Sequence, residues 1–412
     1  MSERHLAAAP VPALEAIQAL ERDHVLQTYR RAPVAFARGQ GVYLYDTEGR
    51  RYLDLLSGIG VASLGHAHPG LALALAEQAA ELVHTSNLFF HPLQGQVAAR
   101  LSALSGLPRA FLCNSGTEAV EACLKFARRY WHAQGSSPRT GFVAFEHGFS
   151  GRTMGALSVT WDAHYREPFG PLVPGVTFVP PGNADAVEAA VSDETAAILV
   201  EPIQGEGGVR PLPAETVAAV ARAAARHGAL IIADEVQCGL GRTGVPFRYQ
   251  AVGLPPDLVA VGKALGGGMP VAAALVSDRV AGAIGFGDHG TTYGGNLLAC
   301  RAALVFLDAL TIGGLLAQVR EAGAHLESGL RQLALRRPVV REVRGAGLMW
   351  GLDLHEDAAA VVPAALDRGL IVNRTATTVV RLLPPFVISP AEIDEGLGVL
   401  DATLSHVFGG SR

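Results

Sequence analysis

The most informative stretch of the chain is residues 258–268, with the sequence LVAVGKALGGG. An apolar run typical of a buried strand leads into Gly262 and Lys263, and three glycines follow shortly after. The chain has 33 lysines and arginines, of which only Lys125 and Lys263 are lysines. Because a desolvated lysine can lose its proton and an arginine cannot, Lys263 is a candidate nucleophile that forms a Schiff base with a carbonyl cofactor. A lysine that extends from a strand end to water is the alternative.

Similar short apolar runs recur between residues 61 and 305 and alternate with helical segments. This pattern predicts an α/β fold with a mostly parallel central sheet. The runs are 110–113, 142–145, 196–200, 229–233, 258–261 and 271–276. We expect a large cofactor-binding domain over residues 61–310 and a smaller C-terminal α+β domain over 311–412. Residues 1–60 are expected to form an arm and a small antiparallel meander that packs with the small domain.

Composition narrows the class of protein. At 412 residues, 49% hydrophobic and 17% charged, the chain is typical of a folded enzyme with a large core. A net charge of -5 gives no electrostatic reason to expect nucleic acid, and no apolar stretch approaches the roughly 18 residues of a membrane helix. The N-terminal apolar residues are interrupted by Pro10, Pro12 and Glu15, so no signal peptide is expected. The four cysteines lie far apart without metal-binding spacing, which is typical of reduced thiols in a cytoplasmic protein. His66 and His68 have no third ligand nearby in the sequence, so we do not expect a metal.

Polar or ionisable residues follow five of the apolar runs. In open α/β sheets, ligands bind outside the carboxyl ends of the strands, so these residues are expected at one edge of the sheet. They are Asn114 to Thr117, Glu146 with His147, Glu201, Asp234 with Glu235, and Lys263. The pattern locates a site without identifying its chemistry.

Ser115-Gly116-Thr117-Glu118 begins a predicted helix. The sequence is either a simple capping box or a phosphate site, because open N–H groups and the helix dipole both favour an anion there. On the same helix, Lys125 lies four residues after Glu121 and is interpreted as a surface ion pair.

Asp234 ends an apolar run, where a carboxylate is costly without a cationic partner. A pyridinium nitrogen would satisfy it, and a helix cap or a structural ion pair is the alternative. Arg381 also lies within an apolar run and needs an anion, for which Glu206 is a candidate. Phe149 stands near Arg152, so a ring that can stack lies beside a cation that can bind a carboxylate.

Six motifs together resemble the class III aminotransferases, which are pyridoxal-phosphate (PLP) enzymes of fold type I. They are NSGTEA at 114–119, GRT at 151–153, EPIQGEGGV at 201–209, DEVQCG at 234–239, GKALGGG at 262–268 and TYGGN at 292–296. The resemblance extends from about residue 41 to 397 in consistent order, and six motifs in register are highly specific. GLGRTG at 239–244 matches a dinucleotide pattern but is not followed by an expected helix start, so a nicotinamide or flavin is not expected.

The resemblance implies a role for each matching residue. Lys263 would bind pyridoxal 5'-phosphate covalently and move the proton, and Asp234 would pair with the pyridine nitrogen. The other cofactor contacts would be Ser115, Gly116 and Thr117 at the phosphate, Thr292 of a second subunit at the same phosphate, Phe149 and Val236 on the two ring faces, and Gln237 at the phenolic oxygen. The substrate contacts would be Arg152, Thr291, Ile59, and Arg381 with Glu206 covering it. A homodimer with shared sites is therefore implied.

Within the class, the motifs are most similar to the acetylornithine aminotransferase branch. This implies transfer of the ω-amine of N-acetylornithine to 2-oxoglutarate, giving the semialdehyde and glutamate in arginine biosynthesis. The aliphatic Ile59, at the position of a tyrosine in ornithine aminotransferases, favours an N-acylated donor. N-succinylornithine, 4-aminobutyrate, ornithine or a carrier-bound lysine precursor remain alternatives. Ser150 and Val120 depart from residues common in the family, which leaves the substrate preference more open than the lysine chemistry.

Overall fold

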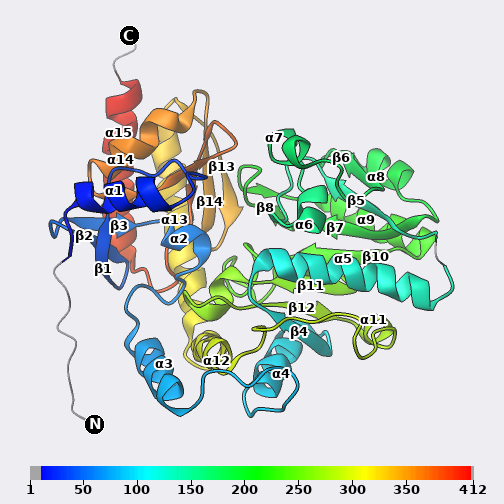
Figure 1. The fold of residues 1–412 in the computed structure, drawn as a ribbon. Coiled ribbons are helices and arrows are strands. Elements are labelled where there is room, and N and C mark those ends of the chain that lie inside the picture. The colour runs from blue at the N-terminus through cyan, green and yellow to red at the C-terminus, as the bar shows by residue number, and fades with distance from the viewer. Residues whose placement is uncertain (1–10, 137, 410–412) are drawn as a thin grey trace.

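The computed structural model describes residues 11–136 and 138–409. Figure 1 shows a large sheet flanked by helices and, beside it, two smaller sheets formed by the N-terminal and C-terminal parts of the chain. The α/β fold class expected from the sequence is confirmed.

The central sheet has seven strands, and six of them run in the same direction. In order across the sheet they are β4 (Arg109–Cys113), β12 (Ala272–Val276), β11 (Leu258–Val261), β10 (Leu230–Asp234), β7 (Thr195–Val200), β5 (Gly141–Phe145) and β6 (Val176–Val179). β12 is antiparallel to both of its neighbours, so β4 keeps the direction of β11. The carboxyl ends of the six parallel strands therefore lie at one edge.

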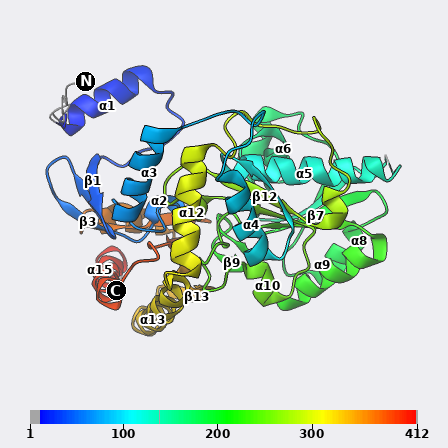
Figure 2. The same ribbon diagram turned by 90° about the horizontal axis from the view of Figure 1, so that it is seen from below.

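Helices cover both faces of this sheet, which explains the uninterrupted apolar runs. Alternate residues of β10 enter two different cores: Ile231 belongs to the core that includes α9 (Ala214–His227), and Ile232 belongs to the core under α5 (Gly116–Ala133). Figure 2 shows α5 and α9 on opposite sides of the strands. A strand that is buried on both faces does not alternate between apolar and polar residues.

The N-terminal meander joins a strand from the far end of the chain. Its strands β1 (Phe36–Gln40), β2 (Tyr43–Asp46) and β3 (Arg51–Asp54) are antiparallel, and β15 (Leu370–Ile371) pairs in parallel with β3. A third sheet has the order β13 (Val340–Ala346), β14 (Met349–Leu354), β17 (Val379–Leu382) and β16 (Asn373–Thr375). The division into domains near residues 60 and 310 stays a prediction.

The remaining segments connect and cover these sheets. The helices are α1 (Leu14–His24), α2 (Ser57–Gly60), α3 (Pro69–Glu81), α4 (Gln94–Ser105), α6 (Met154–Ser158), α7 (Ala163–Arg166), α8 (Ala184–Ala190), α10 (Arg248–Val252), α11 (Asp278–Ala281), α12 (Leu297–Thr311), α13 (Leu315–Arg336), α14 (Val361–Leu366) and α15 (Pro390–Phe408). A short hairpin pairs β8 (Ile203–Gln204) with β9 (Arg210–Pro211), and the 3-10 turns are Glu167–Phe169, Lys263–Gly266 and Ala358–Ala360.

The two histidines considered as metal ligands have other partners. His66 Nε2 lies 2.8 Å from Asp54 Oδ2, and the His68 side chain caps α3 by accepting the Leu71 N–H at 3.1 Å. In the part of the chain that the structure describes, no three His, Cys, Asp or Glu side chains form a group that could hold a metal ion. No single helix there is long and apolar enough to cross a bilayer, and α12 with α13 meets that test only as a pair bent by 65°.

Candidate active site

Asp234 and Lys263 are brought to the same edge by neighbouring parallel strands. Asp234 is the last residue of β10 and pairs in register with Ala260 of β11, and Lys263 follows β11 after one residue, Gly262. Lys263 has a φ of 40°, a conformation that is strained for a residue with a side chain. Burial lowers the pKa of the Lys263 amine, and the charges of Glu206, Arg381 and Asp234 also act on it. These are the surroundings that a nucleophilic amine requires.

Asp234 is a buried carboxylate, 5% exposed. Its Oδ1 accepts the Val236 N–H at 3.1 Å, and it forms no salt bridge with any residue that the structure describes. Burial raises the pKa of Asp234 to about 6, although the Val236 N–H and the charge of Lys263 oppose this. A cationic ring nitrogen beside Asp234 would restore its ionised form, so the residue fits the pyridinium of PLP.

The start of α5 is held unusually close to two strand ends. Ser115 caps the helix by accepting the Glu118 N–H at 3.4 Å. A Cβ at Gly116 would lie only 2.6 Å from the Val236 side chain, and one at Gly262 would be in tight contact, 3.3 Å, with the Gly116 backbone, so glycine lets these segments approach closely. The first N–H groups of any helix lack intrahelical acceptors. They lie here at the same sheet edge as Lys263, which suits the phosphate of the cofactor.

Thr117 ties this helix start to the loop after β5. Its Oγ1 lies 2.9 Å from Thr153 Oγ1 and accepts the N–H groups of Arg152 and Thr153, each at 3.3 Å. In the same loop, the Phe149 N–H donates to Glu201 Oε1 at 2.8 Å. The loop after β5 therefore contacts both the predicted phosphate site, through Thr117, and Glu201.

Arg381 and Glu206 form the pair expected from the sequence. The Arg381 side chain is fully buried on β17, and its Nη1 donates to Glu206 Oε1 at 2.6 Å and to Gln237 Oε1 at 3.1 Å. Its Nε donates to Asn373 Oδ1 at 3.1 Å. Burial opposes ionisation of Glu206, but the Arg381 charge outweighs it and lowers the pKa of the Glu206 carboxyl. A substrate carboxylate could replace Glu206 on this guanidinium.

Arg152 and Ile59 lie toward solvent. The Arg152 guanidinium carbon is 3.7 Å from the centre of the Tyr165 ring, which itself packs edge-on to Phe149. Ile59 is 39% exposed with a φ of 65°, a left-handed conformation that is rare for a β-branched residue. Tyr165 was not predicted, because the four-residue helix that carries it has no periodicity that could mark it.

Thr291 and Thr292 lie in a pocket of about 540 Å³ that Lys263 does not line. Thr291 Oγ1 accepts the Asn114 side-chain amide at 3.2 Å within the same chain, whereas Thr292 is exposed. The predicted contact of Thr292 with a second subunit's cofactor stays a prediction.

A larger pocket of about 640 Å³ borders two of the other predicted residues. Phe149 and Glu206 line it together with Trp161, Tyr165 and Arg374. This pocket gives a substrate room to reach Glu206, the partner of Arg381.

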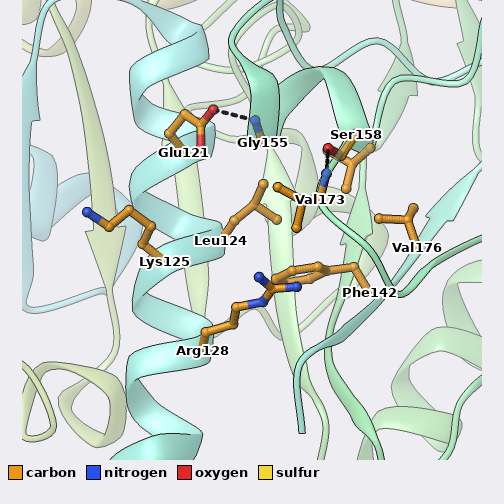
Figure 3. Close-up of a pocket in the computed structure, with 10 residues that line it drawn as sticks. Glu121, Leu124, Lys125, Arg128, Phe142, Gly155, Ser158, Val173 and Val176 are labelled. Atoms are coloured by element: carbon orange, nitrogen blue, oxygen red, sulfur yellow. Dashed lines mark hydrogen bonds between the residues drawn. The ribbon is translucent and has the colours of Figure 1, made fainter. Parts of the chain in front are cut away.

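The prediction that Lys125 forms an ion pair with Glu121 is wrong. Figure 3 shows Glu121 directed toward Gly155, away from Lys125. Glu121 Oε1 accepts the N–H groups of Gly155 at 2.7 Å and Ala156 at 3.2 Å, and Lys125 Nζ lies 2.8 Å from His289 Nδ1. Unpaired N–H groups at the start of α6 outcompete the exposed ammonium, because an exposed i,i+4 pair stabilises a helix by only about 0.3–0.5 kcal/mol. The small pocket in Figure 3, about 70 Å³, is lined by none of the predicted site residues.

Sequence comparison with known proteins relates this chain to aminotransferases. The family model described as "Aminotransferase class-III" matches residues 25–404. The acetylornithine aminotransferase of Gloeobacter violaceus is 44% identical over 392 residues, which are 95% of this chain and 98% of that protein. That of Aquifex aeolicus is 43% identical over 378 residues, with 92% and 98% covered.

Solved structures agree with this result. The ornithine aminotransferase of Toxoplasma gondii superposes with a TM-score of 0.92 at 30% identity, covering 96% of each chain. The acetylornithine aminotransferase of Elizabethkingia anophelis has a TM-score of 0.85 at 30% identity, covering 96% of this chain and all of that one.

Proposed function

Because the chain belongs to the class III aminotransferase family, we propose that it moves the ω-amino group of N-acetylornithine to 2-oxoglutarate, giving the semialdehyde and glutamate. It is a PLP-dependent aminotransferase. Relatives that are 40–45% identical over most of their length carry the name acetylornithine aminotransferase, which supports this reaction. The proposed reaction implies a role in arginine biosynthesis.

When bound, PLP supplies the reactive carbonyl and the electron-withdrawing ring that carry an amino group between substrates. We assign Lys263 as the residue that holds the cofactor and whose neutral Nζ accepts the proton from the substrate carbon bearing the amine. Asp234 holds the ring nitrogen protonated. The remaining proposed cofactor contacts are Ser115, Gly116 and Thr117 at the phosphate, Phe149 and Val236 at the ring faces, and Gln237 at the ring oxygen.

The observation that carries the substrate proposal is the buried pair between Arg381 and Glu206. Moving Glu206 away from the fully buried Arg381 guanidinium would leave an uncompensated charge, which is costly unless another anion takes its place. Glu206 supplies one when the donor has no carboxylate near the transferred amine, as in N-acetylornithine. Glutamate and 2-oxoglutarate bring their own carboxylate, so the same arginine serves both substrates. Arg152, Thr291 and Ile59 are proposed to contact the acylated end of the donor.

Ornithine is the second candidate donor, since an ornithine aminotransferase has a TM-score of 0.92 with this chain. A free α-ammonium group needs a hydrogen-bond acceptor or an anion. The aliphatic Ile59 provides neither, and this favours the acylated donor.

A panel of ω-amines tests the proposal. With PLP and 2-oxoglutarate present, we expect glutamate formation with a far higher kcat/KM for N-acetylornithine than for ornithine or 4-aminobutyrate, measured by a coupled glutamate assay. Omitting 2-oxoglutarate should stop turnover after one equivalent of semialdehyde. Efficient turnover of 4-aminobutyrate without any of N-acetylornithine would overturn the substrate assignment and leave the aminotransferase class intact.

We also propose a homodimer in which each subunit contributes Thr292 to the other's phosphate site. The segment before α4 exposes three large apolar side chains in a row: Leu88 (84%), Phe89 (68%) and Phe90 (106%). Asn87 joins this segment to the loop that carries Thr292, donating to Thr291 O at 3.3 Å and Gly294 O at 2.9 Å. An exposed apolar patch beside a predicted site supports a subunit interface there.

Mixed dimers test the shared site. Co-expressed Lys263→Ala and Thr292→Ala subunits should form mixed dimers that contain one intact site, so activity should exceed that of either homodimer. Tandem affinity tags on the two subunits isolate the mixed species, and the coupled assay measures it. Activity no higher than the sum of the two separate variants would contradict sharing of Thr292.

The four cysteines are reduced and buried in the structure. Free buried thiols are typical of proteins from a reducing compartment, and they support the cytoplasm as the proposed location.

A further inference from the structure

Glu201 joins two loops that carry different parts of the proposed site. It follows β7 directly, and its two carboxyl oxygens accept two separate backbone N–H groups. Oε1 accepts the Phe149 N–H at 2.8 Å, and Oε2 accepts the Gly205 N–H at 3.1 Å. We propose that Glu201 is a positioning residue that fixes the ring-stacking segment at Phe149 and the carboxylate switch at Glu206 relative to each other. The inference rests on the proposed aminotransferase function, which assigns those two roles.

On one side, Glu201 fixes the backbone of the loop between β5 and α6. In this loop, Gly148 O also accepts the Trp161 N–H at 2.9 Å, and the Ser150 N–H donates to Thr160 Oγ1 at 3.0 Å. These bonds hold residues on either side of Phe149, and Glu201 holds Phe149 itself. The height of the Phe149 ring over the cofactor site therefore depends directly on this carboxylate.

On the other side, Glu201 fixes the residue before Glu206. Gly205 lies so close to Gln237 that a Cβ at 205 would overlap the Gln237 side chain. Beyond it, Glu206 O accepts the Thr375 hydroxyl, and Glu206 Oε1 accepts Arg381 Nη1. The Glu206 backbone is thus held on both sides, so only its side chain would need to move when a substrate carboxylate replaces it on Arg381. A switch of this kind needs a fixed backbone and a mobile carboxylate.

The charge state of Glu201 suits a residue beside Asp234. Burial, and then the charge of Asp234, raise the pKa of Glu201 to about 8, so the carboxyl is mainly neutral at pH 7. A neutral carboxyl still accepts N–H groups on both oxygens and adds no second negative charge next to Asp234. Gln204 Oε1, which is buried and has no hydrogen-bond partner among the described residues, lines the same small cavity as Glu201 and could accept a hydrogen bond from the protonated carboxyl.

Glu235 provides a matched control one strand away. It follows β10, its Oε1 accepts the Tyr249 N–H at 2.6 Å, and its Oε2 accepts the Arg248 N–H at 3.0 Å. Burial also raises its pKa, to about 7. The two residues therefore share their acceptor pattern and a raised pKa, but Glu235 fixes α10, which carries no proposed site residue.

The test compares Glu201→Gln with Glu235→Gln. A glutamine keeps one acceptor oxygen and turns an amide toward the other N–H, so each variant loses one hydrogen bond. Two quantities are measured: the PLP dissociation constant of the cofactor-free protein, by fluorescence titration, and kcat/KM of the donor and glutamate half-reactions, by stopped-flow absorbance. For Glu201→Gln we expect PLP binding to weaken about tenfold, and the donor half-reaction to fall about tenfold more than the glutamate half-reaction. The donor depends on Glu206 to neutralise Arg381, whereas glutamate does not.

Glu235→Gln should lower the melting temperature and leave both quantities at their wild-type values. If Glu201→Gln changes both half-reactions equally and leaves the PLP dissociation constant unchanged, the positioning role is wrong. Glu201→Asp, which keeps both oxygens on a shorter stem, decides by the same two quantities if the glutamine variant does not fold. A wild-type enzyme inactive with N-acetylornithine would refute the proposed substrate alone, because PLP binding would still test Glu201.

Discussion

Lys263→Ala should lower kcat by about 10⁴-fold or more while the protein still folds and binds PLP, because it removes both the covalent anchor and the proton-transfer group. The Lys263 amine lies at the end of β11, next to Asp234 and the Arg381–Glu206 pair, and its pKa is lowered by burial. No other lysine is available in the chain to replace it except Lys125, which lies on α5 and contacts His289 instead. The coupled glutamate assay and circular dichroism measure activity and fold.

Two further variants separate charge from chemistry. Lys263→Arg keeps the positive charge but should be as inactive as the alanine variant, because a guanidinium does not lose its proton. Lys125→Ala, the matched control, should leave kcat close to that of the wild type. Borohydride reduction followed by peptide mapping should find PLP on Lys263. A kcat near wild type in Lys263→Ala, or the label on Lys125, would contradict the proposed chemistry.

The central sheet could be predicted because its strands are buried on both faces. Uninterrupted apolar runs such as 229–233 and 258–261 correspond to β10 and β11 within one residue at each end. β6 was not predicted, since this edge strand is only partly buried and contains a polar position. The reversed direction of β12 was also not predicted, because the apolar run 271–276 looks the same whichever way the strand runs.

The chemical groups of the site were easier to predict than their positions. A buried arginine is costly without a partner, and this cost together with the family resemblance pointed from Arg381 to Glu206. The Glu121–Lys125 prediction failed because spacing along a helix carries no information about N–H groups on another segment. The two hydrogen bonds of Glu201 could likewise not be predicted. They join Glu201 to Phe149, 52 positions away, and to Gly205, 4 positions away, and only the fold brings these groups together.

The second large effect is expected at Asp234. Asp234→Asn should lower kcat by about 10³-fold, because a neutral amide cannot hold the ring nitrogen protonated. A charge pair at about 4 Å contributes on the order of 4 kcal/mol at an effective dielectric near 20, and each pKa unit corresponds to about 1.4 kcal/mol. Loss of this pair therefore lowers the pKa of the ring nitrogen by about three units, below neutral pH, and the cofactor no longer withdraws electrons effectively.

Asp257→Asn is the matched control for this substitution. Asp257 is also a carboxylate whose pKa is raised by burial, and it accepts the Ile231 N–H at 3.0 Å and pairs with Arg279 at 3.2 Å. It precedes β11, at the opposite end of the sheet from Lys263. We expect Asp257→Asn to lower the melting temperature without changing kcat, and Asp234→Asn to lower kcat with the fold retained. Steady-state kinetics and thermal unfolding of the two PLP-loaded variants measure both effects, and equal kcat values in the two would remove Asp234 from the mechanism.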